Sequence, residues 1–292
     1  MRYEAPETIE RASQLLAEAS GVTRVLAGGT DLLVQMKSEV IEPDLVVDIK
    51  RITETRTVTD LGGGAFRIGA AVTGAELKEH AALKAAWPGV VEAANLIGST
   101  QVQGRATMGG NLCNGSPAAD SVQGLIAAGA VANIAGPAGR PQVPGEDVMI
   151  GVRKLALGKG ELVASFELPK RAAGSGDAYL RFIPRTEMDI AVVGCGIALT
   201  RDASGVVTAA RVALGAVAER PLLVADAAKA IIGSTLDEAA LARLADAASA
   251  ACRPIDDKRG TREFRIKVAG VLARRVAEIA YARASGAKGP AH

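Results

Sequence analysis

In the first 70 residues, stretches whose apolar residues have helical spacing take turns with stretches whose apolar residues are typical of strands. Between Thr8 and Ala19 the apolar residues recur every three or four positions, which predicts an amphipathic helix. Short apolar runs at 22–26 and 45–49 predict two buried strands. Three glycines separate β-prone residues within 56–70, and this pattern predicts a β-hairpin whose glycines make the turn.

The next 60 residues combine helical periods with a long glycine-rich stretch. Residues 75–97 have helical spacing, and Pro88 should divide them into two helices. The stretch 98–119 has five glycines and no sustained period, so we expect a loop. Because the apolar helix expected at 122–130 follows directly, this loop should be ordered. Long ordered loops are usually functional, which makes it the best place to look for a site.

The second half of the chain predicts a separate α+β part. The segment KRAAGSGD has the composition of a connection, so we place a domain boundary near Gly174, between domains at 1–173 and 174–292. Strands are expected at 190–200 and 206–218, joined by the turn DASG. Three helices should follow, at 222–232, 236–251 and 262–284, and the last of them should pack on the second sheet.

Composition and charge exclude several classes of protein. The 34 basic and 32 acidic residues give a net charge of +2, too weak a field to indicate nucleic acid or an anionic membrane as a partner. The first residues lack the apolar core of a signal peptide, and no apolar run could span a bilayer. Three widely spaced cysteines do not suit a disulfide framework. These features predict a cytoplasmic protein.

The residues for several kinds of chemistry are missing. Three cysteines cannot supply the four thiolates of an iron–sulfur cluster, so any such cluster belongs to a partner. The two histidines, His80 and His292, make neither a zinc site nor a Ser-His-Asp triad. We assign His80 to a solvated helix surface. The chain also contains neither the Rossmann G-x-G-x-x-G after a strand nor the P-loop motif.

Two separate glycine-rich segments carry the strongest functional signal. In VLAGGTDLL, Gly28 and Gly29 follow a strand and let backbone N–H groups approach an anion, while Thr30 adds a hydroxyl. Taken alone, this segment is more often a plain turn. The second segment, ATMGGNLCNGSPAADS, is dense in hydrogen-bond donors and ends at the carboxylate Asp120. A side chain at Gly109 should therefore project into a bound pyrophosphate, with little effect on the fold.

Together the two segments predict a dinucleotide site. A pyrophosphate needs donors from both sides, and a ribose or ribityl hydroxyl needs an acceptor such as a carboxylate. Each charge-assisted hydrogen bond contributes about 1.5–3 kcal/mol, so several could hold the ligand without a covalent link.

Four motifs resemble the FAD-binding medium subunits of molybdenum hydroxylases, the family of xanthine dehydrogenase and carbon monoxide dehydrogenase. They are AGGTDLL, TMGGNLCNGSPAADS, YLRFIPRTEMDIAVV and RGTREFR, in matching order along nearly the whole chain. The resemblance implies an α+β fold, with a two-lobed FAD-binding domain of the vanillyl-alcohol-oxidase type (lobes about 1–54 and 55–173) and a smaller carboxy-terminal domain. It implies FAD bound noncovalently by Ala27, Gly28, Gly29, Thr30, Asp31, Leu32, Ile97, Thr107, Gly109, Gly110, Asn111, Asp120, Val163, Arg181 and Ile190. At Arg181 the family commonly has lysine.

The resemblance also implies a hetero-oligomer. A large subunit would hold the molybdenum cofactor, a small subunit would hold 2Fe-2S clusters, and FAD on this chain would pass electrons to an external acceptor. No residue need act as a general acid or base. Two alternatives remain: a stand-alone FAD oxidoreductase, for which the sequence shows no catalytic base, and an assembly scaffold that has lost its flavin.

Some individual residues have competing interpretations. We expect Cys113 to be a buried small residue because no second cysteine lies nearby to form a redox pair. Tyr179 could stack on the flavin or could anchor the second domain. The basic residues between 253 and 267 could dock an acidic partner, but interleaved acids make a solvated helix flank an equal explanation.

Overall fold

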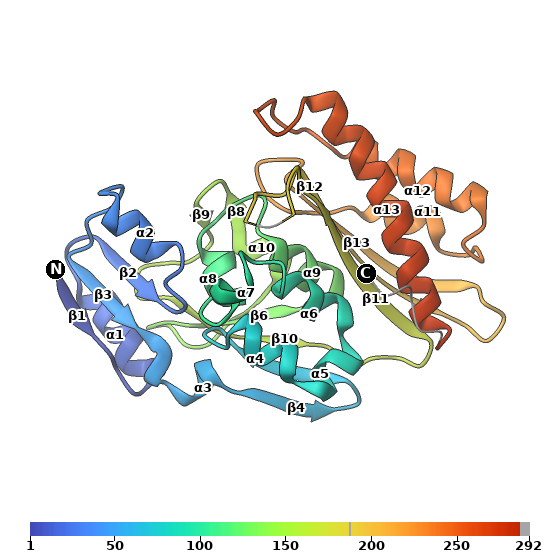
Figure 1. The fold of residues 1–292 in the computed structure, drawn as a ribbon. Coiled ribbons are helices and arrows are strands. Elements are labelled where there is room, and N and C mark those ends of the chain that lie inside the picture. The colour runs from blue at the N-terminus through green and yellow to red at the C-terminus, as the bar shows by residue number, and fades with distance from the viewer. Residues whose placement is uncertain (187, 287–292) are drawn as a thin grey trace.

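The first lobe is a small parallel sheet with two helices, at one end of the molecule (Figure 1). The computed structural model describes residues 1–186 and 188–286. The sheet order is β1-β3-β2, so β2 is an edge strand. The predicted first helix is confirmed, and the Thr8 hydroxyl caps it by accepting a hydrogen bond from the Arg11 N–H at 3.2 Å. The elements are β1 (Arg2–Glu4), α1 (Ile9–Glu18), β2 (Thr23–Leu26), α2 (Leu32–Lys37) and β3 (Leu45–Asp48).

A five-stranded antiparallel sheet of order β4-β5-β10-β6-β7 forms the centre of the second lobe. The predicted hairpin is confirmed as β4 and β5, and its turn residues Gly62, Gly63 and Gly64 all have positive φ, which glycine adopts without strain. A short hairpin, β8–β9, lies beside this sheet. The bounds are η1 (Ile49–Arg51), α3 (Thr53–Arg56), β4 (Val58–Gly62), β5 (Ala65–Gly69), β6 (Val131–Ala135), β7 (Gln142–Pro144), β8 (Met149–Gly151), β9 (Lys154–Leu155) and β10 (Leu162–Leu168).

The helices of the second lobe differ from the sequence prediction in two places. Three helices replace the two expected at 75–97, because His80 ends one and begins the next, its Nδ1 accepting from the Leu83 N–H at 3.2 Å. The ring of His80 also packs edge-on against Phe66, so the assignment to a solvated surface was wrong. The expected loop at 98–119 contains two short helices. The bounds are α4 (Gly74–Glu79), α5 (Ala81–Ala86), α6 (Pro88–Ala94), α7 (Thr100–Gln103), α8 (Met108–Cys113), α9 (Asp120–Ala128) and α10 (Gly145–Val148).

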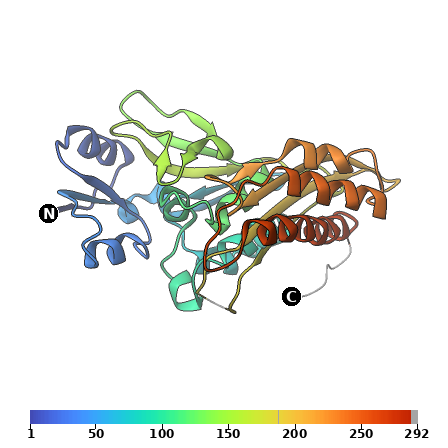
Figure 2. The same ribbon diagram turned by 90° about the horizontal axis from the view of Figure 1, so that it is seen from above.

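The carboxy-terminal part is an antiparallel sheet of order β11-β12-β13-β14 with three helices on one face (Figures 1 and 2). The long last helix has the predicted bounds. The helix expected at 222–232 begins later, because Leu222 and Leu223 pair with β13 as a short edge strand. The bounds are β11 (Ser175–Phe182), β12 (Val193–Arg201), β13 (Val207–Gly215), β14 (Leu222–Leu223), α11 (Ala225–Ile231), α12 (Glu238–Ala250) and α13 (Arg262–Ala284).

Helix α9 joins the second lobe to the carboxy-terminal sheet. All nine of its residues are buried, between α6 and the face of the sheet opposite α11–α13. Gly196 on β12 permits this close packing, since a Cβ there would lie 2.8 Å from the backbone oxygen of Gln123. The expected α+β fold is confirmed. Among the described residues, no helix has both the length and the apolar character needed to span a membrane.

Polar contacts also bind the two parts. The buried carboxylate of Asp177 on β11 accepts from the Gly89 N–H at 2.8 Å and from Arg171 at 2.6 Å. Arg283, near the end of α13, donates to Glu92 on α6 at 3.0 Å and to the Asp177 carbonyl at 2.8 Å. Because these bonds tie α13 and β11 to α6, the carboxy-terminal part is fixed against the second lobe.

A cavity between two glycine segments

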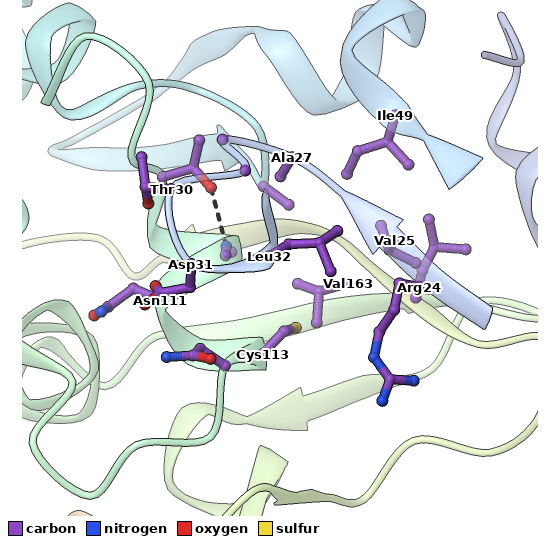
Figure 3. A pocket seen from close by; sticks show the side chains of 18 of the residues that line it. Arg24, Val25, Ala27, Thr30, Asp31, Leu32, Ile49, Asn111, Cys113 and Val163 are labelled. Atoms are coloured by element: carbon purple, nitrogen blue, oxygen red, sulfur yellow. Dashed lines mark hydrogen bonds between the residues drawn. The ribbon is translucent and has the colours of Figure 1, made fainter. Parts of the chain in front are cut away.

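A cavity lies between the first lobe and the second, and both glycine segments line it (Figure 3). Its volume is about 540 Å³. Twelve of the fifteen residues predicted to bind FAD are in its wall. They are Ala27, Gly28, Gly29, Thr30, Asp31, Leu32, Ile97, Thr107, Gly109, Gly110, Asn111 and Val163.

The first segment turns from β2 into α2 at one side of the cavity. Gly29 has φ +80°, a conformation that glycine adopts freely. Gly28 packs against the second segment, since a Cβ there would lie 2.1 Å from the Arg105 carbonyl oxygen. We interpreted both glycines as clearing space for an anion. For Gly28 the structure shows another reason, because its missing side chain lets the two segments touch.

The second segment forms the start of α8. Thr107 caps this helix, its hydroxyl accepting from the Gly110 N–H at 3.0 Å. Gly109 does not face open space, because a Cβ there would lie 2.4 Å from the Ala70 carbonyl oxygen. The expectation that a Gly109 side chain would enter the pyrophosphate without harming the fold was therefore wrong. Gly110 is the open position, where an added Cβ would approach only Thr107 Oγ1, at 3.0 Å.

Asn111 presents a donor to the cavity. Its side-chain oxygen accepts from the N–H and the hydroxyl of Ser121, at 3.1 and 2.7 Å. These bonds fix the orientation of the Asn111 amide. Its NH₂ group then remains to donate to a ligand. Val25, Ile49 and Leu162 add apolar side chains to the cavity wall, and Figure 3 shows Val25 and Ile49 on the side away from Thr30 and Asn111. The cavity thus combines a polar, glycine-rich side with an aliphatic slot.

Asp120, Arg181 and Ile190 do not line this cavity. Asp120 is 7% exposed, and its two carboxylate oxygens accept from the Tyr179 hydroxyl and from Arg181, each at 2.7 Å. Burial raises the pKa of Asp120 to about 6, although Arg181 and Tyr179 oppose the rise. Ile190 is 52% exposed on the loop after β11. Tyr179 is buried and joins β11 to α9, which is the anchoring role we considered for it.

The cavity wall also contains polar residues that the sequence interpretation missed. Arg24, Arg153 and Glu161 all line it. Glu161 directly precedes β10, two residues before the predicted Val163, and that nearness in sequence was the signal that could have found it. Cys113 lines the cavity too, so its prediction as a buried residue was wrong. The surrounding walls raise the pKa of its thiol to about 12, while the side chain stays open to water within the cavity.

Family models match both parts of the chain. Residues 1–171 match the FAD binding domain in molybdopterin dehydrogenase, and residues 178–280 match the CO dehydrogenase flavoprotein C-terminal domain. The chain belongs to this flavoprotein family. The expected domain types, an FAD-binding domain followed by a carboxy-terminal domain, are thereby confirmed.

Curated relatives and solved structures agree with this assignment. The chain is 32% identical to the carbon monoxide dehydrogenase medium chain of Hydrogenophaga pseudoflava, over 96% of this chain and 97% of that one. It is 30% identical to the xanthine dehydrogenase FAD-binding subunit of Escherichia coli O157:H7, over 97% of each. The structure of the Hydrogenophaga enzyme lacking the Mo-pyranopterin moiety superimposes with a TM-score of 0.92 at 34% identity, covering 97% of this chain and 98% of that one. Quinoline 2-oxidoreductase from Pseudomonas putida 86 gives 0.87 at 28% identity, covering 99% and 98%.

The residues present fit an FAD. Gly29 and Gly110 line the cavity without side chains, Asn111 and Thr30 add polar groups, and the apolar side chains of the wall suit a flat ring. Over residues 1–186 and 188–286, no cluster of three or more His, Cys, Asp or Glu residues could hold a metal ion. The cavity therefore has the donors for a dinucleotide.

Proposed function

We propose that this chain binds one FAD noncovalently in the cavity between its two lobes and passes electrons within a molybdenum hydroxylase complex. The observation that supports this most strongly is that residues 27–32 and 107–111, which are far apart in sequence, line one cavity in a chain of this flavoprotein family. The pyrophosphate would lie between Gly29 and Gly110, where the missing side chains let it approach the backbone closely.

FAD, when bound, supplies the redox chemistry, because it can take up and release electrons one or two at a time. The protein positions it. Asn111 would donate through the NH₂ group that Ser121 leaves free, and Ile97 and Val163 would shield the ring system from water. Asp120, Arg181 and Ile190 would act from the carboxy-terminal side, and Asp120 would have to exchange one of its present bonds to accept from a cofactor hydroxyl.

The partners we propose are a small iron–sulfur subunit and a large molybdenum subunit, in a cytoplasmic hetero-oligomer. Relatives named medium chain or FAD-binding subunit support this, as do the three free cysteines. Electrons would enter this FAD from the iron–sulfur subunit and leave to an external acceptor. We divide the chain into domains at 1–173 and 174–292, a division supported by the start of the carboxy-terminal sheet at Ser175.

Affinity purification of the tagged chain from its native cells tests this function. We expect two further subunits, with iron, molybdenum and about one releasable FAD per tagged chain. If the chain carries FAD but copurifies with no metal-containing protein, the stand-alone oxidoreductase is supported instead. If the intact complex contains no flavin, the proposal is refuted and the scaffold alternative stands.

A further inference from the structure

A second pocket, which we call the junction pocket, lies between the second lobe and the carboxy-terminal part, where α6 packs against β11 (Figure 1). Its volume is about 620 Å³, and it is open to solvent. The second lobe contributes the hairpin turn at Gly63 and Gly64 and the end of α5, and the carboxy-terminal part contributes Ser175 of β11 and Arg283 of α13. Among the described residues, none lines both this pocket and the cavity between the lobes.

Arg171 is held in one orientation at the wall of the junction pocket. Its guanidinium lies over the Trp87 ring, 4.4 Å from the ring centroid. Its Nη1 group donates to the Ala86 carbonyl and, at 2.6 Å, to the buried carboxylate of Asp177. Within the described residues, its Nε and Nη2 groups make no hydrogen bond. Because a guanidinium has five N–H donors, the remaining ones are available to a ligand in the pocket.

Arg283 supplies a second cation to the same wall. Its Nη1 group donates to Glu92 at 3.0 Å and to the Asp177 carbonyl at 2.8 Å, and its Nη2 group donates to Glu92. These partners fix both arginines, but neither Glu92 nor Asp177 is itself in the wall. In the described part of the chain, the wall therefore contains two guanidinium groups and no carboxylate. Ser175 adds a hydroxyl, which bonds the Thr200 hydroxyl at 2.8 Å.

We infer that the junction pocket is a second ligand site, which binds a small molecule carrying a phosphate group between Arg171 and Arg283. The guanidinium fork matches the oxygens of a phosphate, and a phosphate has enough acceptor oxygens to bond two arginines at once. The pocket volume leaves room for an organic part beside Ala85 and Pro88. A ligand here would touch both the second lobe and the carboxy-terminal part, so it would stabilise their junction. The site goes beyond the proposed function and does not depend on FAD.

The fluorescence of Trp87 tests this assignment, because Trp87 is the single tryptophan of the chain and its ring lies against Arg171. The purified full-length chain is titrated with inorganic phosphate while sodium chloride keeps the ionic strength constant. We expect a saturable change in fluorescence with a Kd of about 1 mM or tighter. Equilibrium dialysis with radiolabelled phosphate measures the same binding independently of the tryptophan signal.

Two substitutions on α5 locate the bound phosphate. Ala85 is exposed and lines the pocket, so Ala85→Glu adds a carboxylate to the wall without disturbing the core. Repulsion between like charges should weaken phosphate binding at least about fivefold. The matched control is Ala82→Glu, at an exposed position of the same helix outside the wall, and its phosphate affinity should stay within about twofold of the wild type. Arg171→Lys, which keeps a positive charge beside Asp177 but loses the fork, should also bind phosphate more weakly.

Two results would overturn the inference. If wild type and Ala85→Glu bind phosphate equally well, the phosphate is held elsewhere, for example at the glycine segments. If dialysis detects no saturable binding by the wild type up to about 10 mM phosphate, the pocket is not a phosphate site. The FAD affinity of Ala85→Glu should equal that of the wild type, because the junction pocket and the cavity between the lobes share no lining residue. Failure of either proposal is therefore distinguishable from failure of the other.

Discussion

Two adjacent glycines, Gly109 and Gly110, should respond in opposite ways to the same substitution. A Cβ at Gly109 would lie 2.4 Å from the Ala70 carbonyl oxygen and 2.7 Å from the Ala70 Cβ. Neither atom belongs to a flexible side chain, so the backbone at Ala70 or that of α8 must move. Overpacking of this kind costs about 1–3 kcal/mol. We expect Gly109→Ala to lower the free energy of unfolding by that amount without FAD present.

Gly110→Ala should leave the fold intact and damage the site. The added carbon meets only Thr107 Oγ1, and a helical alanine gains about 0.5–1 kcal/mol over glycine, which offsets the crowding of the cap. In the site that we propose, the same carbon would project where the pyrophosphate approaches the backbone. At about a hundredfold excess of FAD over Kd, a bound ligand stabilises the folded state by roughly 2.7 kcal/mol. Gly110→Ala should lose most of this FAD-dependent gain.

Urea unfolding of both variants, each with and without FAD, measures the four free energies. If Gly109→Ala is as stable as the wild type without FAD, the close approach to Ala70 does not constrain the fold. If Gly110→Ala keeps the whole FAD-dependent gain, the pyrophosphate does not lie at this position. Wild-type protein carried through the same titrations is the control for both comparisons.

Three further predictions concern the rest of the chain. The raised pKa of Asp120 lies above the ~3.9 of an unfolded aspartate, so the folded state keeps a proton that the unfolded chain releases between about pH 4 and 6. The free energy of unfolding should therefore fall as pH rises through this window, and Asp120→Asn should show a shallower slope in urea titrations; equal slopes would count against the raised pKa. Arg265 is 3% exposed and bonds Asp257 at 2.6 Å and the Val192 carbonyl at 2.7 Å. Arg265→Ala should cost about 3–5 kcal/mol, and a loss under 1 kcal/mol in the same titration would contradict this. Cys113 is the exposed thiol, whereas Cys195 and Cys252 are buried. Alkylation followed by mass spectrometry should modify Cys113 slowly in the FAD-free chain and more slowly with FAD; labelling that FAD does not affect would place the cofactor elsewhere.

The sequence predicted those helices and strands whose bounds and turns are decided by residues close together in the chain. Helix α13 has the expected bounds because Thr261 caps it, with its hydroxyl accepting from the Phe264 N–H at 3.2 Å, and the helix packs on the sheet as expected, although Phe264 and Val271 of the predicted apolar face are exposed. The glycine hairpin at β4–β5 is equally local, since its three turn glycines need no distant contact. Such patterns are visible from sequence because the residues that decide them are neighbours.

Long-range contacts explain what the sequence interpretation missed. The role of Gly109 depends on Ala70, and that of Gly28 on Arg105, partners whose proximity no local pattern shows. Arg24 precedes the first glycine segment directly, yet only the strand order reveals that it lies at a free edge. In the structure, the carboxylate of Asp120 accepts hydrogen bonds from two residues of β11, which the sequence did not indicate. The segments of the site were therefore predictable, but the direction in which each residue faces was not.

The visible absorption spectrum of the purified chain, titrated with FAD and followed by mild denaturation, tests the central claim most directly. We expect the bands of oxidised flavin to appear with about one FAD bound per chain, and denaturation to release intact FAD, as noncovalent binding requires. If neither the isolated chain nor its native complex takes up FAD in excess, the cavity between the glycine segments is not a flavin site.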